Sequence, residues 1–508
     1  MSQTPHLPIF LWVLMPSIGL GPARADDPPP TTLKIERFDR DPGWEAHNNR
    51  ITPKEYPTVV QDFGFSRSNF AGRSAGEMGG LVTRAYEPAF YADKIGPRTL
   101  DDKLTASGAF AVTKTVAGGG VFFGFFRAEQ PGGGGRPICS LGLDVDCEQA
   151  GCRLAVRLIT GKNQSCGTFV TPYLPGKFRP TPLKNDGTRY RWKLDYDPQA
   201  ADGKGRFTFT IDSDTHKTQD YGPLPGASQE EARARFPDTK TFTVDLTEGF
   251  RRQNTVFDRF GMMNMMKTGG NMNIYFDDLD YDGRSQDFAR DPAWDAAGNR
   301  ATYKAADAGG AQNFGFSDTN HAGGSPGEIG GVFWRTEKDW GWYADKVGPL
   351  SFDDRLEARG KVKLVAGGPD ADMCLGWFRT DGGDAPPDRT GDFLGVKIGG
   401  PTRVGHMFAP AFTVSEALRG LADRAPVFEP GRTYEWSLVY DPAARGGQGA
   451  ITAALGGESV TLDLKPDQKQ KARNARFDRF GLFSVYPGGQ IVRMYVDDLQ
   501  YTASRPGH

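Results

Sequence analysis

Four polar residues recur in a glycine-rich stretch that occurs twice in the chain. Residues 62–80 (DFGFSRSNFAGRSAGEMGG) return at 313–331 (NFGFSDTNHAGGSPGEIGG), with 12 of 19 positions identical. The shared polar residues in and just after the two copies are Asn69 and Asn320, Glu77 and Glu328, Arg84 and Arg335, and Asp93 and Asp345. A pair of carboxylates could act as acid and base in cleaving a glycosidic bond. Glu77 lies among glycines, however, which favours the structural role of accepting N–H bonds from a tight turn.

A lyase would instead need a tyrosine or histidine base beside a cation that neutralises a uronate carboxylate. The first copy offers Arg84, Tyr91 and Arg127, and the second offers Arg335, Tyr343 and Arg379. His47 becomes Gly298 in the second copy, so a histidine mechanism could work only in the first. If the protein is an enzyme, the candidate catalytic residues are Glu77, Arg84, Tyr91, Asp93, Glu328, Arg335, Tyr343 and Asp345.

Binding a sugar requires less than cleaving one, because aromatic faces stack on pyranose rings while Asn, Asp and Arg bond the hydroxyls. The candidate ligand-binding residues are Trp44, Asn69, Arg84, Tyr91, Arg127, Trp294, Asn320, Arg335, Trp340, Trp342, Tyr343 and Arg379. Trp340 and Trp342 have the same parity and lie beside the charged Lys338 and Asp339. They are therefore expected on one exposed strand face.

The cysteines indicate the compartment. Cys139, Cys147, Cys152 and Cys166 lie within 28 residues, inside an insertion in the first copy, and their spacing lacks the close C-x-x-C pairs of a zinc site. In an exported protein such a cluster predicts two local disulfides, and three pairings remain open. Cys374 is expected to be a buried free thiol.

The N-terminus resembles a secretory signal. Residues 7–21 (LPIFLWVLMPSIGLG) form an apolar run, and Ala23 and Ala25 supply the small residues of an A-x-A cleavage site. Cleavage after Ala25 would make the protein secreted or periplasmic. The run is too short to span a membrane, and no later stretch is apolar enough, so the mature chain is expected to lack a membrane span.

The charge balance and the internal duplication indicate the expected partners and the number of domains. Of 508 residues, 66 are glycine, and 61 basic residues nearly balance 63 acidic ones, so nucleic acid is an unexpected partner. The duplication predicts two domains. The predicted division is a signal peptide at 1–25, a lead-in linker at 26–33, one β-sandwich repeat with the disulfide-bearing insertion at 34–283, a second repeat at 284–503, and a tail at 504–508.

The predicted elements are mostly strands. Residues 103–116 alternate apolar and polar side chains, and 121–127 (VFFGFFR) is apolar on both faces, as in a strand buried between two sheets. Residues 190–196 (YRWKLDY), followed by Asp197-Pro198, predict an antiparallel hairpin that recurs at 434–440. Short helices are expected only at 228–235 and 467–474. The fold class is therefore all-β, with two tandem antiparallel sandwiches and little helix.

The hairpin Tyr-x-Trp-x-Leu-x-Tyr-Asp-Pro and the closing strands at 275–279 (YFDDL) and 495–499 (YVDDL) resemble the concanavalin A-like lectin and glucanase jelly rolls. That resemblance implies a structural calcium held by carboxylates of the opening and closing strands. The implied ligands are Asp39, Asp41, Asp278, Asp287, Asp291 and Asp498, with carbonyl groups completing the six to eight oxygens that calcium requires.

These expectations converge on an exported protein that binds carbohydrate or another extracellular or cell-envelope surface through tandem lectin-like sandwiches. Two alternatives remain open at this point. One is a glycan-cleaving enzyme, either a glycoside hydrolase or a polysaccharide lyase. The other is a structural envelope protein whose repeats simply pack together.

Overall fold

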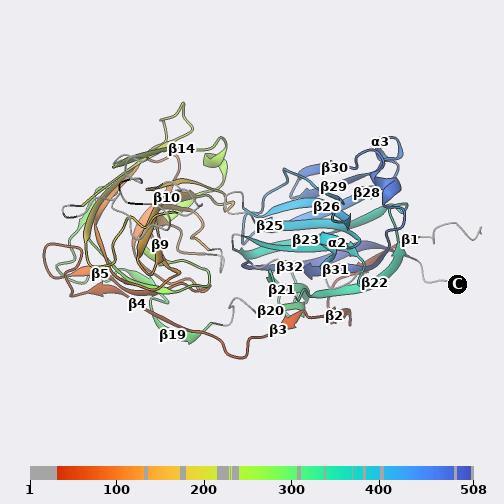
Figure 1. Ribbon diagram of the computed structural model, residues 1–508, viewed down its shortest axis with the longest axis horizontal. Helices are drawn as coiled ribbons and strands as arrows, with labels where there is room; N and C mark the ends of the chain where they lie inside the picture. Colours follow the sequence, from red (N-terminus) through yellow and green to blue (C-terminus); the bar gives the residue numbers. More distant parts are fainter. Residues whose placement is uncertain are drawn as a thin grey trace, which may run out of the picture.

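The chain folds into two β-sandwiches placed side by side, as the ribbon of the computed structural model shows (Figure 1). The structure describes residues 31–130, 135–171, 179–213, 215, 228, 230, 240–305, 311–336, 339–368, 370–381, 385–400, 405–485 and 489–504. The predicted signal peptide, the helix expected at 228–235 and residues 505–508 of the tail lie outside these residues, apart from Ser228 and Glu230.

The first sandwich consists of a nine-stranded and a seven-stranded sheet. In spatial order, the nine-stranded sheet contains β14 (Thr241–Asp245), β13 (Arg206–Asp212), β12 (Arg189–Asp197), β7 (Leu104–Thr115), β16 (Asn271–Tyr281), β5 (Glu77–Thr83), β4 (Thr58–Ser66) and β19 (Arg300–Lys304), with β17 (Arg284–Gln286) beside β16. The seven-stranded sheet contains β11 (Ser165–Phe169), β10 (Gly151–Ile159), β9 (Ser140–Glu148), β8 (Gly119–Phe126), β15 (Val256–Asn264), β6 (Phe90–Thr99) and β18 (Asp295–Ala297).

The second sandwich repeats this arrangement. Its nine-stranded sheet contains β3 (Arg50–Ile51), β20 (Gln312–Ser317), β21 (Glu328–Trp334), β32 (Ile491–Ser504), β23 (Leu356–Gly367), β28 (Thr433–Asp441), β29 (Ala450–Leu455) and β30 (Glu458–Asp463), with β1 (Thr31–Glu36) beside β32. Its seven-stranded sheet contains β2 (Glu45–His47), β22 (Trp342–Leu350), β31 (Phe477–Ser484), β24 (Ala371–Phe378), β25 (Phe393–Gly400), β26 (Met407–Ser415) and β27 (Leu418–Leu421).

The all-β prediction and its main elements are confirmed. The alternating segment at 103–116 forms β7, the doubly apolar segment at 121–127 forms most of the fully buried β8, and the predicted hairpins are β12 with β13 and β28 with β29. Each sandwich encloses one large apolar core between its two sheets. The described helices are short: η1 (Phe250–Arg252), α2 (Pro387–Thr390), α3 (Ala444–Gly447) and α4 (Gln468–Lys471). Of these, α4 fulfils the expectation at 467–474.

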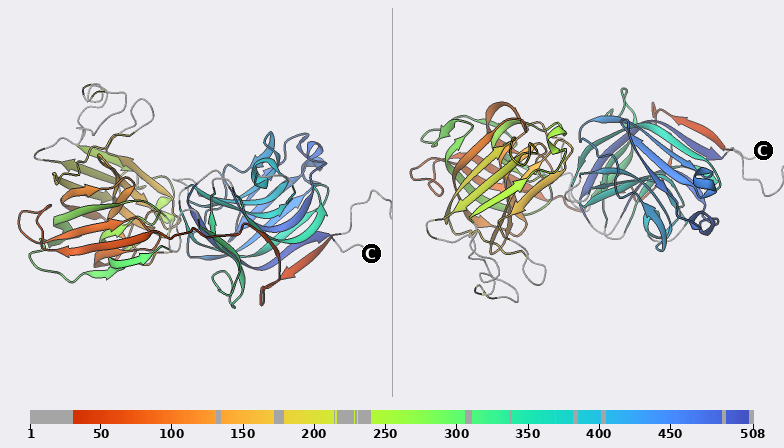
Figure 2. Two further views of the ribbon diagram at one scale, coloured as in Figure 1. Left: turned by 60° about the horizontal axis from the view of Figure 1, so that its bottom comes forward. Right: turned by 90° about the horizontal axis from the view of Figure 1, so that it is seen from above.

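The opening strands of the two repeats are exchanged. Strand β1 pairs with β32 over six residues, and β2 and β3 pair with β22 and β20, so the first opening segment completes the second sandwich. Conversely, β17, β18 and β19 pair with β16, β6 and β4, so the second opening segment completes the first sandwich. In Figure 2 the red strand β1 lies at the edge of the lobe that otherwise carries the blue C-terminal strands.

The boundaries of the sequence repeats therefore do not coincide with those of the sandwiches, because the first residues of each repeat belong to the other sandwich. Residues 34–51, which the sequence assigns to the first repeat, lie in the second sandwich, and part of the predicted lead-in linker, from Thr31 onward, is strand. Phe38 and Trp44 are buried in the core of the second sandwich, whereas Phe288 is buried in the core of the first. The apolar side chains of each opening segment thus anchor it to the sandwich of the other repeat.

The prediction of two disulfides is wrong in number. Cys147 and Cys152 form a disulfide across the turn between β9 and β10, where they are direct cross-strand partners. Cys139, Cys166 and Cys374 are thiols, and Cys374 is buried as expected. Cys139 precedes β9 and Cys166 lies on β11, which is separated from β9 by β10, so the sheet holds these two cysteines apart.

Among the helices that the structure describes, none has the length and apolar content needed to cross a bilayer.

Candidate functional site

The two copies of the glycine-rich stretch form matching turns that are each tied together by one buried glutamate. Glu77 is fully buried, and its carboxylate accepts backbone N–H bonds from Phe70 and Ala71 at 2.7–2.9 Å. Glu328 is equally buried and accepts N–H bonds from His321 and Ala322. Both carboxylates therefore perform the structural role, because a buried carboxylate committed to several backbone N–H donors lacks access to substrate.

A second buried carboxylate lies beside each glutamate. Burial, reinforced by the neighbouring carboxylates of Asp278 and Glu77, raises the pKa of Asp277 to about 7. Burial likewise raises the pKa of Asp497 to about 6. The second sandwich contains a compensating cation, because Lys361 pairs with Asp497 in the sheet and its ammonium contacts Asp498 at 2.6 Å.

The first sandwich has Ala109 opposite Asp277 in place of that lysine. Asp277 should therefore hold a proton in the folded state at pH values where it has lost that proton in the unfolded chain. An aspartate in the unfolded chain has a pKa of about 3.9. This contribution to stability is complete below about pH 4 and is lost as the pH rises through about 7. We expect the melting temperature of the first sandwich to fall between pH 5 and pH 8, and Asp277→Asn to flatten that decline.

Calorimetric melting of the wild type and Asp277→Asn across pH 5–8 measures this effect. Asp202→Asn is the matched control, because Asp202 is exposed in the same sandwich, asparagine tolerates its positive φ of 57°, and its charge is not among the causes of the raised pKa of Asp277. Parallel pH profiles for the wild type and Asp277→Asn would contradict the assignment.

The six aspartates implied as calcium ligands do not fit a calcium site. Asp41 and Asp291 accept N–H bonds within their own turns and hydroxyl bonds from Tyr343 and Tyr91, and Asp287 accepts the N–H of Ala289. Asp498 is paired with Lys361, while Asp39 and Asp278 are exposed. Within the described ranges, no group of three or more acidic, histidine or cysteine side chains could hold a metal ion.

The remaining candidate catalytic residues are also engaged in structure. Burial, and then the adjacent Asp291, raises the pKa of Tyr91, and burial with Asp41 does the same for Tyr343, so neither phenol is prepared to act as a base. Asp93 accepts bonds from Tyr281 and Arg284, and Asp345 accepts bonds from Tyr501 and Lys34. Arg284 and Lys34 come from the exchanged opening segments, so these two aspartates fasten those segments in place.

The aromatic candidates are mostly core residues. Trp44 packs against Tyr343 with ring centroids 5.6 Å apart, and Trp294 packs against Tyr91 at 5.7 Å. The expected exposure of Trp340 is wrong, because only 6% of it is exposed and it belongs to an apolar cluster on the outer face of the seven-stranded sheet. Trp342 is half-buried and stacks on His47.

The polar candidates are dispersed. Asn69 and Asn320 are exposed in the two glycine-rich turns. The Arg127 side chain bonds the carbonyl of Glu129, and Arg379 pairs with Asp381. Of the predicted ligand-binding residues, Arg335 lines a pocket, and Arg84 occupies the equivalent place in the first sandwich.

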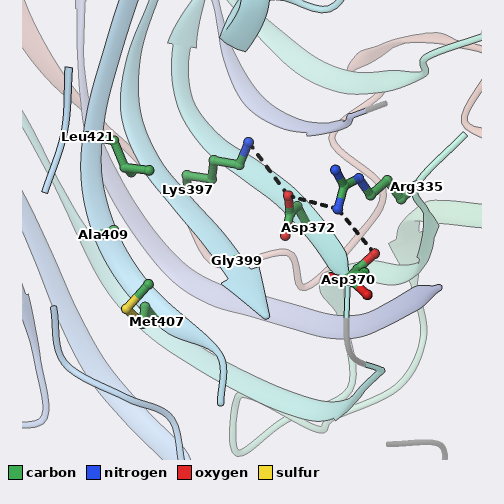
Figure 3. Close-up of a pocket in the computed structure, with 8 residues that line it drawn as sticks. All are labelled: Arg335, Asp370, Asp372, Lys397, Gly399, Met407, Ala409 and Leu421. Atoms are coloured by element: carbon green, nitrogen blue, oxygen red, sulfur yellow. Dashed lines mark hydrogen bonds and ion pairs between the residues drawn. The ribbon is translucent and has the colours of Figure 1, made fainter. Parts of the chain in front are cut away.

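That pocket lies on the outer face of the seven-stranded sheet of the second sandwich and has a volume of about 250 Å³ (Figure 3). Leu394, Val396 and Ile398 of β25 point into the core, so the alternating Lys397 and Gly399 face outward. Strand β24 contributes Asp372 in the same way. The complete set of lining residues is Arg335, Asp370, Asp372, Lys397, Gly399, Met407, Ala409 and Leu421.

The pocket has a charged side and an apolar side. Asp372 lies between Arg335 and Lys397, 3.6 Å from each, and the Arg335 guanidinium also donates to the Asp370 carbonyl (Figure 3). Met407, Ala409 and Leu421 form the opposite wall, and Leu421 is 49% exposed. Burial would lower the pKa of Lys397, but the carboxylates of Asp388 and Asp372 reverse this and raise it, so the lysine stays charged. The pocket therefore offers hydrogen-bond donors, acceptors and an apolar surface together.

Sequence reasoning identified only Arg335 among these lining residues. Asp372, Lys397, Met407 and Leu421 come from four different strands, and the second copy departs from the first at these positions, so the internal repeat gave no signal for them. One feature of the sequence could have indicated Lys397. It is a charged residue within the apolar strand β25, so its side chain must lie on the face opposite the core.

No protein-family model and no curated protein matches the sequence. Among solved structures, domains LG4-5 of the mouse laminin alpha1 chain are 11% identical, cover 90% of this chain and 100% of theirs, and give a TM-score of 0.24. The LG1-3 region of the laminin alpha2 chain is 9% identical over 84% of this chain and 62% of its own, with a TM-score of 0.21. Winged bean acidic lectin, complexed with methyl-alpha-D-galactose, is 14% identical over 37% of this chain and 92% of its own, with a TM-score of 0.25.

All three structures are 14% identical or less and have TM-scores of 0.25 or less, so the all-β fold rests on the sheets of this chain alone. The low identities and TM-scores identify no family.

Proposed function

We propose that this protein is an exported glycan-binding protein whose principal contact site is the pocket of Arg335, Asp372 and Lys397 on the outer face of the second sandwich. The observation that carries the proposal is the pairing of a charge-balanced polar side with an apolar wall. Sugar hydroxyls both donate and accept hydrogen bonds, and the C–H face of a pyranose ring is apolar, so one sugar residue can use both sides at once.

The size and charge of the pocket narrow the ligand. About 250 Å³ is just below the range of about 300–1,000 Å³ found for drug-sized ligands, which suits a single sugar ring of a longer chain. Two cations and two aspartates line the pocket, so a neutral polyhydroxylated group is favoured over an ion. Export is supported by the apolar N-terminal run and by the Cys147–Cys152 disulfide, since disulfides persist in oxidising compartments.

Binding is favoured over cleavage because the candidate catalytic groups are committed elsewhere. Glu77 and Glu328 hold buried turns, and Asp93 and Asp345 fasten the exchanged segments. Cleavage of a glycosidic bond would need two carboxyl groups facing one substrate.

Titration calorimetry with a panel of neutral oligosaccharides tests the proposal. Leu421→Ser removes an exposed part of the apolar wall and should weaken binding by about three- to tenfold. Val116→Ser is the matched control, because Val116 is 44% exposed and lies in the first sandwich. Equal affinities for the two variants would place the ligand elsewhere.

Two further outcomes would contradict glycan binding altogether. Release of reducing or unsaturated ends by the wild type would identify an enzyme. Absence of affinity for every glycan in the panel would favour the structural envelope role.

A further inference from the structure

A cluster of charged side chains occupies, in the first sandwich, the place that the pocket occupies in the second. The paired glycines Gly124 and Gly142 of β8 and β9 correspond to Gly376 and Gly395 of β24 and β25. Asp144 lies two residues after Gly142 in the first sandwich, and Lys397 lies two residues after Gly395 in the second, so these two residues correspond. The cluster on this outer face consists of Arg84, Arg136, Asp144, Asp146, Arg157 and Lys267.

Arg84 and Arg335 are the common element of the two sites. Arg84 pairs with Asp146, and its buried side chain runs along the glycine backbone, where a methyl group on Gly120 would lie 2.4 Å from the guanidinium. Arg335 likewise passes within 2.7 Å of the place where a methyl group on Gly489 would lie. The backbone therefore leaves room for an arginine at this position in both sandwiches, while the surrounding charges differ.

The cluster of the first sandwich has an excess of positive charge. Arg136 and Arg157 both contact Asp144, Arg84 contacts Asp146, and Lys267 is influenced by both carboxylates, so four cations share two carboxylates. Burial, and then the positive charge of Arg84, lowers the pKa of Lys267 to about 8. Lys267 is only partly buried and Asp146 is 29% exposed, so this part of the cluster meets solvent, whereas the side chains of Arg84, Arg157 and Asp144 are only 3–6% exposed. An anion here would relieve the repulsion that Lys267 experiences.

The two sites adjoin across the junction of the sandwiches. Two residues after Arg84, the Tyr86 hydroxyl of the first sandwich donates to the Gln490 side chain of the second at 2.8 Å. The carbonyl of Gln490 accepts the backbone N–H of Arg335. Gln490 therefore links the loop of Arg84 to the segment of Arg335.

We propose that the cluster of Arg84, Arg136, Arg157 and Lys267 binds an anionic group, a carboxylate or a sulfate ester, on a glycan whose neutral part occupies the adjoining pocket. This inference rests on the proposed function and specifies its ligand as an acidic glycan. Guanidinium groups bond planar oxyanions in a bidentate manner, and the neutral pocket beside them accommodates an uncharged sugar residue of the same chain.

Calorimetric titration with a uronate oligomer, a sulfated oligosaccharide and a neutral oligosaccharide of the same length tests the inference. Lys267→Gln should weaken binding of the acidic ligands by about tenfold and leave the neutral ligand unchanged. Lys193→Gln is the matched control, because Lys193 is 59% exposed on the opposite sheet of the same sandwich. The preference between uronate and sulfate identifies which oxyanion the site takes.

The pH dependence gives a readout that a merely structural lysine would not affect. The charged form of Lys267 binds the anion, so wild-type affinity for the acidic ligand should fall by about tenfold in total as the pH rises above about 8, to the level of Lys267→Gln. The charged groups that face Lys267 in the cluster are Arg84, Arg136, Asp144 and Asp146. Lys267→Arg keeps the charge without titrating and should bind well and lose this pH dependence.

The outcomes separate this inference from the proposed function. The inference would be overturned if the wild type bound neutral and acidic ligands equally. It would also be overturned if Lys267→Gln bound the acidic ligands as tightly as the wild type does. Both results would leave glycan binding intact. Failure of all three ligands to bind would overturn both. Acidic selectivity that depends on Lys267 would support both.

Discussion

Phe38→Ala should destabilise the second sandwich by about 3–5 kcal/mol, although Phe38 belongs to the first sequence repeat. Phe38 is 2% exposed and lies in the core of the second sandwich, in edge-to-face contact with Trp44. Removing its ring leaves a cavity and weakens the attachment of the exchanged segment. The positive φ of 54° at this position is the same burden for phenylalanine and alanine, so the change isolates the lost packing.

Phe288→Ala is the reciprocal variant. Phe288 is fully buried in the core of the first sandwich and has a φ of 49°. Hydrogen exchange should show faster exchange in β22 and β32 for Phe38→Ala, and in β6 and β16 for Phe288→Ala. If each substitution instead loosened the sandwich formed by its own repeat, the exchange of opening strands would be wrong.

Gly327→Ala should destabilise the second sandwich by at least about 4 kcal/mol, because the added methyl group would displace the backbone of Phe38. Gly327 has a φ of 110°, and a methyl group there would lie 2.0 Å from the carbonyl oxygen of Phe38. A backbone carbonyl cannot rotate away as a side chain can, so the opening segment would have to move and withdraw Phe38 from the core.

Thermal melting with Gly324→Ala as the control measures this effect. Gly324 lies in the same turn, has open space around it and lacks a left-handed φ. Gly76→Ala should act in the same way on the first sandwich, because its added methyl group would meet the carbonyl of Phe288 at 2.0 Å. Similar melting temperatures for Gly327→Ala and Gly324→Ala would show that the opening segment is not packed against this glycine.

Local patterns made much of the fold predictable. Alternation identified β7 and the hairpins, because a strand with one buried face must place every second side chain in the core. The role of Glu77 was equally readable, since a carboxylate among glycines has backbone N–H groups within reach. Both inferences depend on neighbours that are close in the sequence.

The candidate site was much less predictable. The pocket joins Arg335 to Lys397 and Leu421 through four strands whose order in the sheet is a long-range property. The exposure expected of Trp340 failed for a related reason, because Phe483 of another strand packs against it. The disulfide prediction failed because β10 lies between β9 and β11.

The sequence by itself determined that the chain contains two similar all-β units, each opened by a Phe-x-Arg-Asp-Pro-x-Trp segment and closed by an Asp-Asp-Leu strand. Because the two opening segments share 8 of 13 residues, at 38–50 and 288–300, each presents the same phenylalanine and tryptophan to either core. Only the tertiary structure decided that each opening segment pairs with the closing strand of the other unit. It also decided which charges gather on each outer face, since those charges come from strands that meet only in the folded sheets.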